Sequence, residues 1–152
     1  MNWDLVFTLT NAVALTGWIL LAVLPRRPLV LSTVLYLGVG LLCLAYFLLF
    51  IVSIGGLVDP HRLPGTPEPN LLDYSIAGLR PLFLSDGGIV IGWTHYLAFD
   101  LFAGLWIARD ADSKGVGRLV QLPFLLMTLM AGPIGLGIWL AFRGIRSRPA
   151  ND

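Results

Sequence analysis

The chain has 152 residues, of which 57% are hydrophobic and only 12% charged, and its formal net charge is +1. A typical soluble domain has about 25% charged residues, so this composition predicts an integral membrane protein. The near-neutral charge excludes a nucleic-acid-binding face, which needs a cluster of basic residues. We expect one all-α transmembrane domain over residues 1–152, because four spans of about 20 residues leave room for a single sizeable loop.

Apolar runs predict an integral membrane four-helix bundle with spans at residues 3–24, 29–54, 87–109 and 119–142. The first run begins without Lys or Arg and ends without a small-residue cleavage pattern, so we interpret it as a retained helix and not as a signal peptide. Gly132 and Pro133 fall in the middle of the fourth run, where proline is expected to bend the helix. The chain also lacks an Arg- and Ser-rich plastid leader, so we expect a bacterial or cyanobacterial inner membrane, or a thylakoid.

The connection 55–86 differs in composition from the spans. It contains Pro60, Pro64, Pro67 and Pro69, and prolines at this density predict an extended aqueous loop. His61 lies among these prolines and is interpreted as a solvated loop residue. A short interfacial helix is expected at residues 71–83, because apolar residues recur there at helical spacing. After it, Asp86 is expected to cap the third span.

Basic residues are evenly divided between the two sides of a four-span bundle. The first and third connections carry Arg26, Arg27, Arg109, Lys114 and Arg118, and the opposite side carries Arg62, Arg80, Arg143, Arg146 and Arg148. The positive-inside rule is therefore tied. The short loop beside the first span favours a cytoplasmic location for the Arg26 side.

Two ionisable residues inside the third span are the candidate catalytic residues. Placing such a group at the centre of a membrane helix costs at least about 2.5–3.5 kcal/mol, so His95 and Asp100 are expected to have a function. They are five positions apart and differ by about 140° around the helix, so they do not form a contact pair. Asp100 shares a face with Tyr96 and Gly104, which predicts a groove open to a partner helix or an elongated ligand.

Further candidates for ligand binding surround these two residues. His95 shares its side of the helix with Phe99 and Phe102, which suits an apolar ligand. By depth alone, Asn11 lies level with His95, and Thr128 lies level with Asp100. The complete set of expected substrate-binding residues is Asn11, Trp93, Tyr96, Phe99, Phe102, Gly104 and Thr128.

Structural interpretations remain open beside these functional ones. A buried carboxyl can simply hydrogen-bond to a neighbouring helix, and the tryptophans near helix ends can form an interfacial belt. We predict no metal site, because His61 and His95 lie in unlike surroundings.

Several motifs together resemble a known family. They are Trp93-Thr-His95, Asp100-Leu-Phe102, the run Leu122-Pro-Phe-Leu-Leu126 and Gly132-Pro-Ile-Gly135. The chain resembles the abscisic-acid-deficient-four type of membrane protein, which in plants is required for neoxanthin formation and has many bacterial relatives. The resemblance extends from the first span, through Asn11 and Pro25-Arg26, to Arg143, and it is densest from Tyr74 to Arg143. Arg118 stands where many relatives are expected to have histidine, so any role of that position is not carried over.

The resemblance implies a carotenoid or xanthophyll held along the bundle, and it firmly implies no cofactor. The plant-type reaction converts a 5,6-epoxide into an allene, which requires an acid for the epoxide oxygen and a base for a proton on the adjacent polyene carbon. Our hypothesis is that Asp100, kept protonated by its apolar surroundings, donates to the oxygen while His95 accepts the carbon proton. The reverse assignment stays open.

Three alternatives remain beside an epoxide-opening isomerase. The first is an oxygenase that cleaves β-carotene to a retinal-like aldehyde. The second is a carotenoid-binding protein without catalysis, and the third is a small transporter or assembly subunit. Its expected partners are the lipid bilayer, the isoprenoid ligand and a second copy of the chain, because a polar groove would otherwise stay uncovered in so small a bundle.

Overall fold

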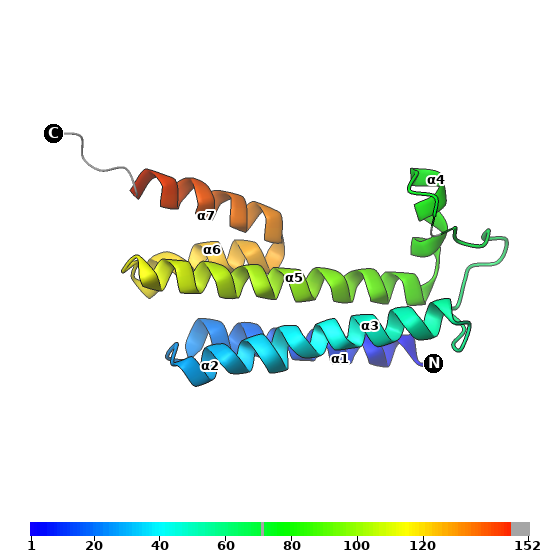
Figure 1. Cartoon of the computed structure of the whole chain (residues 1–152), viewed down its shortest axis with the longest axis horizontal. Coiled ribbons are helices and arrows are strands. Elements are labelled where there is room, and N and C mark those ends of the chain that lie inside the picture. The colour runs from blue at the N-terminus through cyan, green and yellow to red at the C-terminus, as the bar shows by residue number, and fades with distance from the viewer. Residues whose placement is uncertain (71, 147–152) are drawn as a thin grey trace.

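The computed structural model describes residues 1–70 and 72–146, and within them the secondary structure is helical apart from one isolated β-bridge. Three helical stretches in this part of the chain are long and apolar enough to cross a membrane: α1 (Trp3–Val23), the continuous stretch Pro28–Ile54, and α5 (Asp86–Ser113). They lie side by side along the long axis of the molecule (Figure 1). The predicted all-α membrane fold class is confirmed.

The second stretch changes its helical geometry along its length. It comprises α2 (Pro28–Thr33), the π-helical segment η1 (Val34–Gly40) and α3 (Leu41–Ile54). This stretch packs closely on α1 and α5 at η1. There Leu101 of α5 lies against two glycines, Gly17 of α1 and Gly38 of η1. A Cβ atom would lie 2.6 Å from Leu101 Cδ2 if added to Gly17 of α1, and 3.0 Å from it if added to Gly38. The absence of side chains at these positions lets the three spans approach one another.

The connection before α5 packs onto one end of the bundle. It contains two short helical turns, α4 (Ile76–Leu79) and the 3-10 turn η2 (Arg80–Leu84). Trp3 Nε1 donates a 3.0 Å hydrogen bond to the Asp59 carbonyl, which joins the start of α1 to the loop. Asp86 is not the capping residue of α5 as expected. The Ser85 hydroxyl takes that role and accepts from Gly88 N at 3.1 Å.

The chain after α5 also differs from the expectation of one bent span over residues 119–142. It forms α6 (Arg118–Met130) and α7 (Gly132–Arg146), and it reverses direction at Ala131, where φ is −158° and ψ is 82°. The two helices fold back on each other along one half of α5 (Figure 1). Their 13 and 15 residues measure about 20 and 22 Å, so each is shorter than the roughly 30 Å hydrocarbon core. The segment is therefore a helical hairpin that starts and ends at the same end of the bundle.

Side-chain contacts account for the return of α7. Trp139 is fully buried, and its Nε1 donates a 3.0 Å hydrogen bond to Asp110 Oδ2 near the end of α5. The Trp139 ring also packs edge-on against Phe124 of α6, at 5.3 Å between centroids. A single spanning helix would carry Trp139 away from both partners. Pro133 is the second residue of α7, a position that favours helix initiation over a bend.

The hairpin collects most of the basic residues at one end, which we call the arginine-rich end. It contains Arg26, Arg27, Arg109, Lys114, Arg118, Arg143 and Arg146. The opposite end, called the loop end, carries Arg62 and Arg80 together with five acidic residues: Asp4, Asp59, Glu68, Asp73 and Asp86. The expected equal number of basic residues on the two sides is thus wrong, because Arg143 and Arg146 lie at the same end as Arg26 and not at the opposite end. Arg148 lies outside the described residues. The positive-inside rule now predicts a cytoplasmic arginine-rich end.

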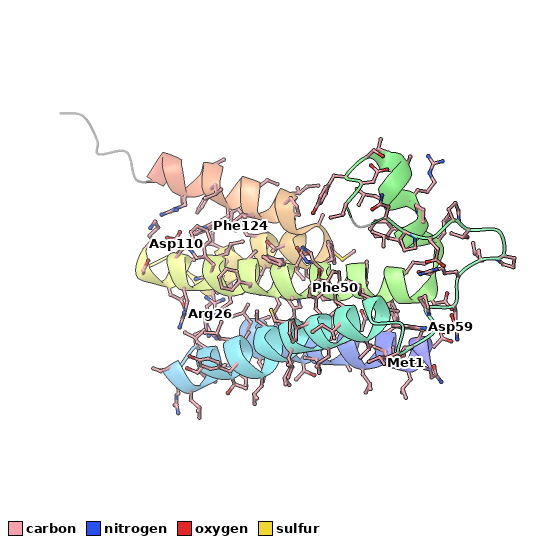
Figure 2. All side chains as sticks on the ribbon, turned by 45° about the vertical axis from the view of Figure 1, so that its right-hand side comes forward. Met1, Arg26, Phe50, Asp59, Asp110 and Phe124 are labelled. Carbon is pink, nitrogen blue, oxygen red and sulfur yellow. The ribbon has the colours of Figure 1, made fainter. Side chains whose placement is uncertain are left out.

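A buried polar network holds the hairpin at this end. The Arg26 side chain is 4% exposed, and its guanidinium donates to Asp112 Oδ1 at 2.8 Å and also to the Gln121 side chain, which is fully buried. Asp110 accepts from Lys114 at 3.0 Å and forms a 3.1 Å ion pair with Arg143 of α7. Figure 2 shows Arg26 and Asp110 near one end of the bundle, with Met1 and Asp59 at the other. These carboxylates of α5 therefore connect it to α6 and α7.

Candidate functional site

A cavity of about 510 Å³ lies between α3, α5 and the loop end. Each helix contributes one face to it, because the lining residues recur at three, four or seven positions. These residues are Tyr46, Phe50, Ser53 and Ile54 on α3, and Gly88, Ile91, Gly92 and His95 on α5. Gly92 leaves space here, since a Cβ atom at this position would lie 3.0 Å from the Phe83 ring. The loop and η2 cover the remaining side.

His95 is the lining residue of α5 farthest from the loop end, and it sits among aromatic rings. Its imidazole centroid lies 5.4 Å from that of Tyr46 and 4.6 Å from that of Phe99. Tyr46 in turn stacks on Phe50 at 5.8 Å. A histidine facing a cavity can take and return a proton, and the surrounding rings suit an apolar, polarizable ligand.

An apolar groove of about 430 Å³ adjoins the cavity at Phe99. It runs between η1, the start of α3, and α5, and its lining is formed by Leu35, Tyr36, Val39, Gly40, Cys43, Ala98, Phe99 and Phe102. From Gly88 to Phe102 the cavity and groove together extend about 21 Å along α5. This shape fits a long apolar molecule with a bulkier end in the cavity.

The lining of the cavity is polar at the loop end. Arg62 and Glu68 form an ion pair there, and both line the cavity. Arg62 also pairs with Ser85 in an isolated antiparallel bridge, which fixes the loop over α5. Polar groups thus meet water at the loop end, while the groove presents apolar surface to the bilayer.

Asp100 lies on another side of α5, against the tip of the hairpin. The residue is 7% exposed, and its carboxyl interacts with the Tyr96 hydroxyl and the backbone amide of Gly132. Tyr96 also donates a 3.0 Å hydrogen bond to the Met130 carbonyl. In the described part of the chain, Asp100 Oδ2 has no hydrogen-bond partner.

The remaining candidates fall into two groups. Trp93 stacks on Tyr96 at 5.1 Å and donates a 3.1 Å hydrogen bond to Asn11 Oδ1, so Asn11 lies near the Asp100 side and not beside the His95 ring. Gly104 and Thr128 occupy packing positions. The Trp18 ring covers Gly104, and the buried Thr128 hydroxyl donates to the Phe124 carbonyl at 2.7 Å.

The structure therefore brings His95, Phe99 and Phe102 to the cavity and groove, and it places Asp100 elsewhere. Sequence reasoning did not single out Tyr46, Ser53, Arg62 and Glu68, because the cavity exists only where α3 and the loop pack against α5. The signal was the seven-residue spacing of Tyr46 and Ser53, which places two hydroxyl groups on one helix face. Across residues 1–70 and 72–146, no three His, Cys, Asp or Glu side chains gather as a metal site requires.

Comparisons with known proteins identify a family. A search of curated proteins and a search of solved structures each found no match. The family model described as ABA DEFICIENT 4-like matches residues 5–139, a range that includes His95, the groove and the hairpin tip. This family is associated with neoxanthin synthesis, in agreement with the membrane-spanning helices and the apolar groove. The chain belongs to the ABA DEFICIENT 4-like family.

Proposed function

We propose that the protein binds a carotenoid or xanthophyll with one ring in the cavity and the polyene chain along the groove, and that it isomerises a 5,6-epoxide to an allene. The observation that carries this proposal is the position of His95. Its imidazole lines the cavity, and its ring contacts Phe99, which lines the groove. A ligand lying through both would pass His95 where its ring joins its polyene chain.

The reaction needs only a proton transfer within the cavity. His95 takes the proton from the polyene carbon next to the ring, and the electron pair of that C–H bond forms the new allenic double bond. The epoxide C–O bond breaks, and the oxygen receives a proton, so substrate and product are isomers. Neutral imidazole is suited to both steps, because it can accept the carbon proton and return it to the oxygen.

Asp100 has a different place in this proposal. Its carboxyl faces Tyr96 and Gly132, whereas His95 faces Tyr46 and Phe99. One ligand ring in the cavity would reach His95 but not the hairpin tip. We therefore assign the proton transfer to His95 and give Asp100 a role in positioning the hairpin.

The test is conversion of a 5,6-epoxycarotenoid by purified protein in lipid nanodiscs. We expect an allenic product from the unmodified protein and a rate lower by about 10²–10⁴-fold in His95→Asn, with pigment still bound. The matched control is His61→Asn. His61 lies outside the cavity lining and has a φ of 52°, which Asn tolerates well, so this variant should retain full activity.

Other outcomes favour the alternatives. Oxygen consumption with aldehyde products would identify oxidative cleavage, and pigment that co-purifies without change would identify a binding protein. A colourless protein that leaves host pigments unaltered would favour a transporter or an assembly subunit. An unchanged conversion rate in His95→Asn would reject the proposed role of His95.

A further inference from the structure

One hydroxyl group in the cavity differs from the other helical hydroxyls. Threonines within helices here donate to the carbonyl three or four residues earlier, which satisfies the hydroxyl without any ligand. This holds for Thr8, Thr10, Thr16, Thr33, Thr94 and Thr128, at 2.7–3.0 Å. Ser53 Oγ is buried, yet it has no hydrogen-bond partner among the residues that the structure describes. Because buried polar atoms are nearly always paired, this atom calls for an explanation.

The surroundings of Ser53 supply one. Ser53 lines the cavity together with His95, on the α3 face that also carries Tyr46 and Phe50. A ligand that fills the cavity would therefore lie beside Ser53, and rotation about the Cα–Cβ bond to another staggered rotamer would turn this hydroxyl toward it. A ligand oxygen would satisfy it, whereas a hydrocarbon would leave it unpaired at a cost of about 1–3 kcal/mol.

The helical register places Ser53 toward the outer end of the ligand ring. Ser53 is seven residues from Tyr46, whose ring contacts His95, so the two levels differ by about 10 Å along α3. Arg62 and Glu68 line the cavity at the loop end, in this same direction. An oxygen at Ser53 would thus be remote from the atoms that react at His95.

We propose that Ser53 recognises an oxygen substituent on the outer part of the ligand ring, so that the cavity selects oxygenated carotenoids over pure hydrocarbons. This inference rests on the proposed function and adds a specificity-determining residue to the same site. Ser53 can donate its proton to a hydroxyl, ether or carbonyl oxygen, or accept one from a hydroxyl group. The neighbouring rings of Tyr46 and Phe50 provide apolar contact for either class of ring.

Two pigments that differ only in ring oxygen provide the test. β-Carotene has no oxygen, and zeaxanthin carries one hydroxyl on each ring; neither has an epoxide, so binding is measured apart from catalysis. We would titrate each pigment into protein in lipid nanodiscs and follow quenching of tryptophan fluorescence. The unmodified protein should prefer zeaxanthin, and Ser53→Ala should weaken zeaxanthin binding about five- to tenfold while leaving β-carotene affinity unchanged.

The matched control removes a hydroxyl that is already satisfied. Thr33 lies on the same continuous helix, and its hydroxyl donates to Leu29 O at 2.9 Å, so Thr33→Val should keep the preference for zeaxanthin. A Ser53→Ala protein that keeps this preference would overturn the role of Ser53 and leave pigment binding intact. Equal affinity of the unmodified protein for both pigments would overturn the inference alone. Failure to bind either pigment would overturn both it and the proposed function.

Discussion

The carboxyl group of Asp100, in the middle of α5, lies directly against Gly132, the first residue of α7. A Cβ atom at position 132 would overlap the carboxyl oxygens. The tip of the hairpin is thus seated on a buried acid, and glycine is the residue that allows this approach. This contact is a structural role for an ionisable group at this depth, consistent with the proposed role of Asp100 in positioning the hairpin.

Gly132→Ala is expected to destabilise the protein by about 1–3 kcal/mol, because the added methyl group forces apart the hairpin tip and α5. Thermal unfolding in detergent measures the effect. The control is Gly137→Ala, also within α7, where a Cβ atom would meet nothing within 4 Å. There the better helix propensity of alanine should leave the midpoint unchanged or raise it. Equal effects of the two substitutions would contradict the contact.

The hairpin makes a prediction about membrane topology. In a protein with Cys43→Ala, single cysteines introduced by Thr66→Cys, Ser113→Cys and Gly144→Cys report on the two ends of the bundle. Residues 113 and 144 both lie at the arginine-rich end, so a membrane-impermeant maleimide should label both only after the cells are permeabilised. Thr66→Cys should react in intact cells. Labelling of positions 66 and 144 from the same side would instead require α6 and α7 to cross the membrane.

Arg26 should contribute far more to stability than its neighbour in the sequence. Its buried guanidinium bonds to Asp112, to Gln121 and to the Ala108 carbonyl at 3.3 Å. Arg26→Ala leaves these groups unpaired, and we expect a loss of about 1.5–3 kcal/mol in the free energy of unfolding. Arg27 is exposed, so Arg27→Ala should change the free energy of unfolding by less than about 0.5 kcal/mol. Equal losses of stability in the two variants would show that the Arg26 network contributes little to the free energy of unfolding.

The Asp73 carboxylate provides a local pH dependence at the loop end. Hydrogen bonds from Ser75, including one from its backbone N at 2.9 Å, hold the pKa of Asp73 below its ordinary value of 3.8. The charged form is the one stabilised, so this contribution is complete above pH 3.8 and is lost as the pH falls through the lower folded pKa. A carbon NMR titration of the carboxyl should give a midpoint below 3.8. A midpoint at or above that value would mean that the hydrogen bonds are absent in solution.

Local sequence features determined the class of this protein. The low charge, the apolar runs and the prolines of the connection predicted an all-α membrane protein, and motifs around His95 and Asp100 pointed to the family that the comparison then showed. These features were sufficient because hydropathy and helix breaking act over neighbouring residues, which the sequence displays directly. The helical angle between His95 and Asp100 likewise predicted that they would not form a contact pair.

Only the tertiary structure decided the direction of the chain after Ala131. Residues 119–142 have the length of a span, but the partners of Trp139 are Asp110 and Phe124, and they lie back at the arginine-rich end. The position of the basic residues follows from that reversal. The cavity also depends on contacts between distant segments, since Ser53 and His95 meet it from different helices and the loop covers it. Such pairings are set by packing and buried hydrogen bonds across the fold, which no local pattern records.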